Sequence, residues 1–183
     1  MIGEGKNMDA FKEITAGTKP FKTAYVAVML WFVGRAIQAA ARVDKEVKKE
    51  FEKLPNGFTF CLGVLPRGPY MIVGKNEKGR VKYMGWKPGG KQIDLDMKIK
   101  NIEAAILMFT FQESTTVASA SDRMTIDGEL PYACAIVRVL DIGEVYLLPK
   151  CIARLAVKRY PAWSFGRKYI GRVRIYFRTI LGY

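Results

Sequence analysis

The fold class follows from one stretch of the sequence, Ile93-Asp94-Leu95-Asp96-Met97-Lys98-Ile99-Lys100-Asn101-Ile102-Glu103-Ala104-Ala105-Ile106-Leu107-Met108-Phe109. Its first half alternates apolar and polar residues, which predicts a half-buried antiparallel strand over residues 91–100 with one face in water. Asn101 is a good N-cap, because its side chain can accept a hydrogen bond from a backbone N–H in the first helical turn. We therefore expect a helix over residues 102–109 immediately after the strand.

Outside this stretch, strands and helices are segregated along the chain. Strands are expected at 58–65, 69–73, 80–86 and 124–128, and helices at 21–54, 114–119, 132–148 and 150–160, after a lead at 1–20. The first helix is apolar in its first half, charged in its second, and ends at Pro55-Asn56-Gly57. We expect a buried or docking helix there, because only ten apolar residues run unbroken and a span needs about 20. Segregated elements predict an α+β fold with an antiparallel-rich sheet covered by helices.

Charge divides the chain into a nearly neutral body and a basic end. The net charge is +13, yet residues 145–183 carry nine Lys and Arg and no Asp or Glu. We expect a lead and extra N-terminal helix at 1–56, one domain at 57–160 and a basic amphipathic tail at 161–183. A basic segment of this kind predicts an anionic partner, which can be a membrane surface, a nucleic acid or an acidic protein.

The residues that catalysis and metal binding most often use are scarce. The chain has no His and three Cys (Cys61, Cys134 and Cys151) without metal-ligand spacing. Asp94 and Asp96 share a strand face and are best read as solvated, and no serine has a His partner. The N-terminus shows no secretory signal pattern. We expect a protein that is not an enzyme, has no cofactor or metal, and is cytoplasmic.

Residues 58–148 resemble the sterol carrier protein type 2 family. The resemblance rests on the alternating strand at 93–99, the helix at 102–109, Thr116-Val117-Ala118-Ser119-Ala120, Arg123-Met124-Thr125-Ile126-Asp127-Gly128, and an apolar last helix at 132–148. One departure is Phe109-Thr110-Phe111-Gln112, which stands where many members carry a Gly between two short helices. The resemblance implies a sheet-and-helix fold with an apolar tunnel that holds a lipid or fatty acyl chain.

The candidate tunnel walls are apolar residues on the strands and short helices. They are Ile93, Leu95, Met97, Ile106, Leu107, Phe109, Phe111, Val117, Met124 and Ile126. Each buried CH₂ of a lipid stabilises its complex by about 0.8 kcal/mol, so such a pocket needs no catalytic group. The same residues could instead pack against each other as an ordinary core.

The tail carries a basic amphipathic helix. Tyr169, Ile170, Val173, Tyr176, Phe177, Ile180 and Leu181 share one predicted face, and Ile175 falls out of register with them. The residues expected to contact a membrane are Arg167, Lys168, Tyr169, Ile170, Arg172, Val173, Arg174, Tyr176, Phe177 and Arg178. Basic residues around an apolar, aromatic face suit a membrane interface. The alternative is that the apolar face docks on the protein's own body or on a second subunit in a homo-oligomer.

The sequence therefore predicts binding of a lipid or fatty acyl ligand, which would allow its transfer, with peripheral membrane contact through the tail. The alternative is a non-catalytic interaction or scaffold module with the same fold and no ligand. Nucleic-acid binding ranks below both, because the body is nearly neutral and shows no nucleic-acid motif.

Overall fold

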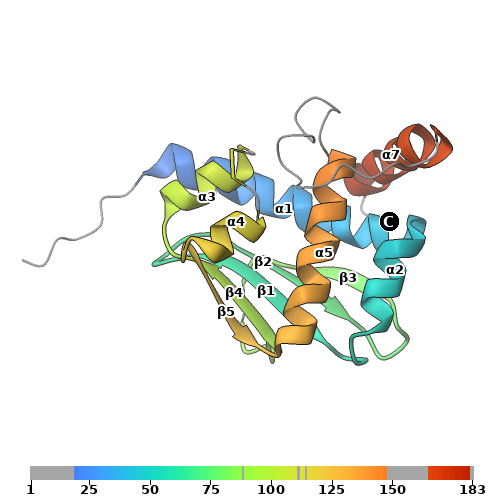
Figure 1. Ribbon diagram of the computed structural model, residues 1–183, viewed down its shortest axis with the longest axis horizontal. Coiled ribbons are helices and arrows are strands. Elements are labelled where there is room, and N and C mark those ends of the chain that lie inside the picture. Colours follow the sequence, from blue (N-terminus) through green and yellow to red (C-terminus); the bar gives the residue numbers. More distant parts are fainter. Residues whose placement is uncertain (1–18, 88, 111, 114, 148–164, 182–183) are drawn as a thin grey trace, which may run out of the picture.

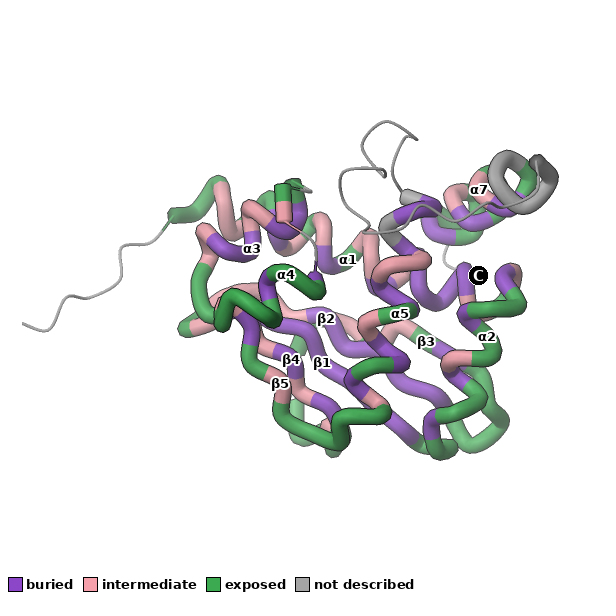
Figure 2. Tube along the Cα trace, in the orientation of Figure 1, coloured by how far each residue is buried: buried purple, intermediate pink, exposed green. Residues whose placement is uncertain are grey.

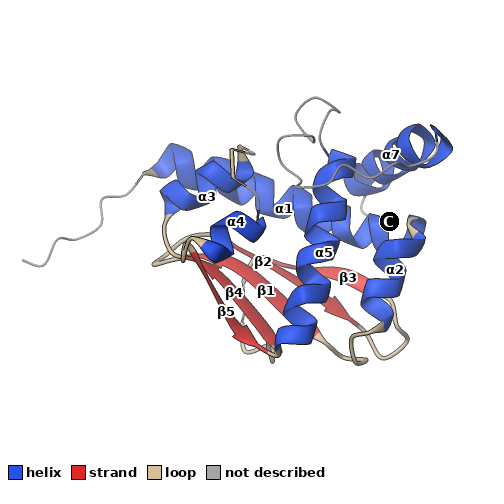
Figure 3. Cartoon of the chain, viewed as in Figure 1, coloured by secondary structure: helices blue, strands red, loops and turns tan. Residues whose placement is uncertain are grey.

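A computed structural model describes residues 19–87, 89–110, 112–113, 115–147 and 165–181, and shows a layer of helices over one sheet (Figures 1 and 3). The strands are β1 (Thr59–Val64), β2 (Tyr70–Lys75), β3 (Val81–Gly85), β4 (Leu95–Ile99) and β5 (Met124–Gly128). The helices are α1 (Pro20–Val43), α2 (Lys45–Glu52), α3 (Ile102–Phe109), α4 (Thr115–Ala120), α5 (Leu130–Leu147) and α7 (Phe165–Leu181). This confirms the predicted α+β class, with an extra helix at the N-terminal end and a basic helix at the C-terminal end.

The five strands form one sheet in the order β3-β2-β1-β4-β5. Three of the four strand pairs are antiparallel, and the central pair, β1 with β4, is parallel. Phe60 lies opposite Leu95 in that pair, and Met97 lies opposite Ile126 in the next. The register therefore places the apolar residues of β1, β4 and β5 on the same face, under the helices.

The core lies between that face and the helix layer (Figure 2). Phe60, Leu95 and Met97 are completely buried there, with Ile136 of α5 above the sheet. The alternation read from the sequence at β4 holds, because Leu95, Met97 and Ile99 are buried while Asp96 and Lys98 between them are half-buried.

The expected single helix over 21–54 is wrong: the chain forms two helices that meet at Asp44. Asp44 has an extended backbone, and its Oδ1 accepts hydrogen bonds from the N–H groups of Glu46 at 2.7 Å and Val47 at 3.1 Å. It is therefore the N-cap of α2. Its Oδ2 accepts a short hydrogen bond from the Tyr146 hydroxyl of α5, so the junction is also tied to the helix that crosses the sheet.

Helix α1 packs closely on the edge of the sheet. A Cβ added to Gly34 would lie 2.6 Å from Cδ2 of Tyr83 and 2.9 Å from Cγ of Met71, so the backbone of α1 touches side chains of β3 and β2. Within the described residues, α1 is the one helix long and apolar enough to cross a membrane. Val26 and Leu30 of α1 nevertheless lie in the protein core, as expected for a buried or docking helix.

The strand expected at 91–100 is shorter than predicted. The strand predicted from residue 91 begins only at Leu95, and Asp94 before it is not simply a solvated side chain. Its Oδ2 accepts a hydrogen bond from the Thr59 N–H at 2.8 Å, and its own N–H donates to the Thr59 carbonyl at 2.9 Å. Asp94 thus fastens the start of β4 to β1. The expected lead and the helical turn at 150–160 lie outside the described residues, apart from the end of the lead.

Candidate functional site

The predicted lipid-contact residues lie on and around the sheet face that α3 and α4 cover. Leu95 and Met97 of β4, Phe109 of α3 and Met124 of β5 are buried in one core, with exposed fractions between 0% and 8%. Because these side chains already contact each other, the innermost part of the predicted tunnel is filled by protein.

The remaining predicted contacts surround this core less tightly. Ile106 and Ile126 are half-buried and pack against it. Ile93 and Leu107 are also half-buried, Val117 of α4 is 49% exposed, and Phe111 lies outside the described residues. The structure thus has a filled centre with a partly exposed apolar margin on α3, α4 and β5.

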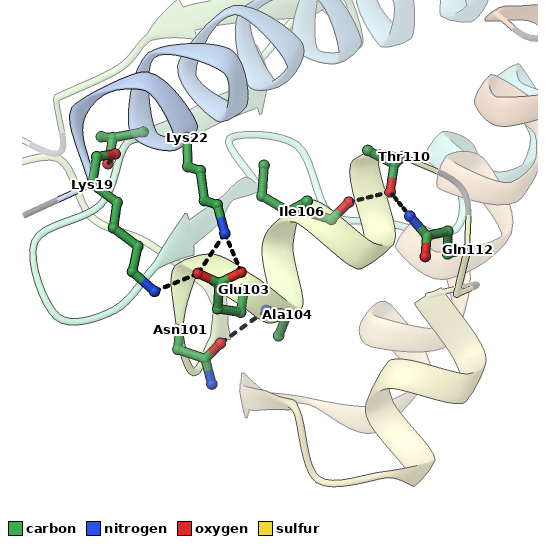
Figure 4. Close-up of polar contacts among 9 residues, drawn as sticks. Lys19, Lys22, Asn101, Glu103, Ala104, Ile106, Thr110 and Gln112 are labelled. Carbon is green, nitrogen blue, oxygen red and sulfur yellow. Dashed lines mark hydrogen bonds and ion pairs between the residues drawn. The ribbon is translucent and has the colours of Figure 1, made fainter.

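Helix α3 is held over the sheet by polar contacts to α1 (Figure 4). The Glu103 carboxylate accepts hydrogen bonds from Lys19 Nζ at 2.5 Å and from Lys22 Nζ at 2.6 and 2.7 Å. These hydrogen bonds lower the pKa of Glu103. At the other end of α3, the Tyr25 hydroxyl donates to the Phe109 carbonyl at 3.1 Å. Asn101 caps α3 as predicted, accepting from the Ala104 N–H at 2.8 Å.

Helix α7 docks on the body through a face that the sequence did not indicate. Its fully or largely buried positions are Gly171, Ile175 and Thr179, four residues apart and therefore on one side of the helix. Ile175 was expected to be out of register with the apolar face, yet it is the residue that packs into the core. The Tyr176 ring stacks on Phe32 of α1 with centroids 6.3 Å apart.

The apolar face that the sequence predicted is largely open to solvent. Ile170, Val173, Phe177, Ile180 and Leu181 are exposed by 55%, 67%, 65%, 71% and 51%. At 3.6 residues per turn, the centre of this row lies on the side of the helix opposite the row of Gly171, Ile175 and Thr179. Helix α7 therefore docks on the body, but through a face other than the predicted apolar one. We call the exposed row of Ile170, Val173, Phe177, Ile180 and Leu181 the open stripe.

The predicted basic contacts divide between the two sides of α7. Arg174 and Arg178 are exposed and lie along one edge of the open stripe. Arg172 is half-buried, and its Nη2 donates to the Val145 carbonyl of α5 at 2.7 Å, so it helps to hold α7 on the body. Arg167, Lys168 and Tyr169 belong to α7 by their backbone, and their side chains lie outside the described residues.

A second exposed apolar surface lies on the first half of α1, on the side of the helix opposite Val26 and Leu30. Phe21 is 90% exposed, Val28 62%, and Tyr25 and Trp31 41% each. The guanidinium carbon of Arg35 lies 5.2 Å from the centroid of the Trp31 ring, a cation–π distance. Nothing in the alternation or capping of the sequence distinguished these residues from the buried ones of the same helix.

Cys61 of β1 lies near Asp96 and Lys98 of the neighbouring strand β4. Burial raises the pKa of the Cys61 thiol to about 12, and the nearby Asp96 adds to this. Lys98 Nζ lies 2.9 Å from Asp96 Oδ2. A thiol with a raised pKa stays protonated at neutral pH and is a poor nucleophile. Among the described residues, no group of three or more His, Cys, Asp or Glu could hold a metal ion.

Sequence reasoning missed an open groove between α2 and the β2–β3 hairpin, which encloses about 840 Å³. None of the ten predicted lipid-contact residues lines it. Its basic residues lie on α1, on α2 and on the hairpin, which only the folded chain brings together. They are Arg42, Lys48, Lys75, Lys78 and Arg80. The cluster of Lys and Arg around the hairpin loop was the one signal available in the sequence.

The order of elements and the sheet topology define an α+β fold in which a layer of helices covers one five-stranded mixed sheet. No family model and no curated protein matches the chain. Solved structures do match, and three of them are as follows. A UbiJ-SCP2 ubiquinone synthesis protein is 16% identical with a TM-score of 0.41, covering 68% of this chain and 96% of its own. The sterol carrier protein domain 2 of Helicoverpa armigera is 18% identical with a TM-score of 0.42, and the match covers 70% of this chain and 94% of its own.

Sterol carrier protein 2 like 2 from Aedes aegypti is 12% identical with a TM-score of 0.33, covering 53% of this chain and 94% of its own. The three structures carry the name of the family that the sequence resembles, and their TM-scores lie between 0.33 and 0.42. Likeness at this level of identity concerns the fold alone, so the ligand and the activity rest on the residues of this chain.

Proposed function

We propose that this protein is a lipid-binding protein that attaches peripherally to an anionic membrane through α7. The observation that carries the proposal is the open stripe, which holds five large apolar side chains, each more than half exposed. A soluble surface rarely shows so much apolar area in one row without a partner. The opposite face of α7 is bound to the body, so membrane contact would not require the fold to open.

The charges beside the stripe support a bilayer as the partner. Arg174 and Arg178 are exposed at its edge, and residues 145–183 contain no acidic residue. Each basic residue near an anionic leaflet contributes about 1 kcal/mol, while the apolar side chains enter the interface. We place the lipid ligand at the margin formed by Ile106, Val117 and Ile126, where α3 and α4 meet the sheet.

Flotation of the full chain with vesicles tests the membrane half of the proposal. We expect it to float with phosphatidylcholine–phosphatidylglycerol vesicles, and part of this binding to persist at high salt because apolar contact is not screened. The V173S/F177S variant should lose about thirtyfold in partition, since two side chains that are two-thirds exposed contribute about 2 kcal/mol or more together. L130S, which removes a 73% exposed side chain from α5, is the matched control. Equal losses in V173S/F177S and L130S would reject α7 as the contact helix.

Native mass spectrometry with organic extraction of the purified protein tests the ligand half. A co-purifying lipid of defined mass supports the carrier function and identifies the ligand class. An unliganded mass that is unchanged after incubation with fatty acids, sterols and phospholipids rejects it.

A second function, an interaction module without a ligand, has one observation in its favour. Leu95 and Met97, two of the predicted tunnel walls, are completely buried against protein. If the centre stays filled in solution, the open stripe would instead receive another protein. In that case the native mass would be free of lipid and V173S/F177S would leave vesicle flotation unchanged.

A further inference from the structure

The groove between α2 and the β2–β3 hairpin is separate from every residue used in the proposed function. Its walls come from the end of α1, from α2 and from the hairpin, and Figure 1 shows α2 beside β3. A volume of about 840 Å³ lies within the range of about 300–1,000 Å³ that small-molecule sites occupy. The groove is thus large enough for an organic ligand and not merely for a single small ion.

The lining of the groove is strongly cationic. Five basic residues line it, Arg42, Lys48, Lys75, Lys78 and Arg80, against two carboxylates, Glu52 and Glu77. Among the described residues, no carboxylate forms an ion pair with any of the five. Cations gathered around a concave surface reinforce each other's field and attract an anion.

One of these cations is built into the protein. Lys75 is only 8% exposed, and its Nζ donates to the Phe51 carbonyl at 3.0 Å and to the Leu54 carbonyl at 2.7 Å. These bonds fix the ammonium group at the C-terminal end of α2. A lysine ammonium has three N–H donors, so one more remains for a ligand in the groove that Lys75 lines.

The groove also has an apolar part. Phe51 and Val81 line it and are 3% and 5% exposed, so they form its floor and not its rim. A free inorganic ion would leave this floor without a partner. A ligand that has both an anionic group and an organic part would use the whole lining.

We propose that this groove binds a phosphate ester, whose phosphate contacts the cations and whose organic part lies on Phe51 and Val81. Phosphate suits the lining better than a carboxylate does, because it carries up to two charges and three free oxygens for several donors. The guanidinium groups of Arg42 and Arg80 can each bind two of these oxygens, and the lysines act as point charges. The same chemistry is found in a soluble phosphate ester and in the headgroup of a phospholipid.

Isothermal titration calorimetry of the full chain tests the proposal with two probes, inorganic pyrophosphate and monomeric dihexanoyl phosphatidic acid. We expect R80Q to weaken pyrophosphate binding about fivefold, since it removes one charge near the phosphate. R67Q removes the same charge from an exposed position outside the groove and should change the affinity less than twofold. E77Q removes a carboxylate from the lining and should strengthen binding.

The two probes separate the possible sources of the phosphate. Tighter binding of the phosphatidic acid than of pyrophosphate, abolished in R42Q/R80Q, indicates a lipid headgroup. Binding of pyrophosphate alone indicates a soluble ester. Failure of both probes to bind at millimolar concentration, or equal losses in R80Q and R67Q, would overturn the proposal. V173S/F177S should keep its pyrophosphate affinity, so loss of the membrane function and loss of this site give different results.

Discussion

Replacing Asp44 with alanine should destabilise the protein more than the loss of an ordinary helix cap. Asp44 is 4% exposed and caps α2 with one carboxylate oxygen, while the other accepts the Tyr146 hydroxyl. Loss of an N-cap costs about 1 kcal/mol. A hydrogen bond to a charged group contributes about 1.5–3 kcal/mol, and Tyr146 is buried, so its hydroxyl would lose this acceptor without gaining water. We therefore expect D44A to lower the free energy of unfolding by about 3 kcal/mol.

Urea unfolding followed by circular dichroism measures this change. Y146F removes only the hydroxyl and should cost about 1–2 kcal/mol. The double variant D44A/Y146F should be more stable than the sum of the single losses predicts, by about 1–2 kcal/mol, because the two groups share one interaction. Additive losses, or a D44A loss below about 0.5 kcal/mol, would refute the view that Asp44 joins α1, α2 and α5.

Three further predictions concern packing, pH and thiol chemistry. G34A should destabilise by about 1–3 kcal/mol in the same urea assay, because its Cβ would overlap side chains of β2 and β3. G143A, whose Cβ would meet no described residue within 4 Å, should be neutral or gain up to about 1 kcal/mol. Glu103 has a lowered pKa in the folded state, so its contribution to stability is present above its unfolded pKa and is lost as the pH falls through the folded value. The difference in free energy of unfolding between the native protein and E103Q should therefore shrink in acid. A difference that stays constant from neutral to acidic pH would contradict this. Peptide mapping after brief iodoacetamide treatment at pH 8 should find the exposed Cys134 modified and Cys61, with its pKa of about 12, unmodified.

The sequence predicted the elements whose signals are local. The alternation at 93–99 and the cap at Asn101 depend only on neighbouring residues, and both are found in the structure. The break between α1 and α2 at Asp44 is local too. The charged residues that follow Asp44 are, however, as compatible with one continuous helix as with two. What decides between them is the buried Tyr146 hydroxyl, which lies 102 positions along the chain.

The candidate sites were harder to predict because they depend on which surface is covered. Leu95 and Val117 were predicted alike as tunnel walls, yet Leu95 is completely buried and Val117 is half exposed. The basic groove combines residues from α1, α2 and the hairpin, and no spacing along the chain brings Arg42 near Arg80. Such a site can be recognised only from the folded chain.

Helix α7 shows that the most apolar face of a helix need not be the face that docks on the protein. Its most apolar face is the natural choice for docking, yet the body takes the narrower side formed by Gly171, Ile175 and Thr179. Helix α7 lies close to α5 at this point, since a Cβ at Gly171 would be in van der Waals contact with the Tyr146 ring at 3.4 Å. Arg172 adds a hydrogen bond to the α5 carbonyl of Val145. Close packing and a hydrogen bond can therefore hold α7 while the larger apolar face stays free, which is the arrangement that a membrane-binding helix requires.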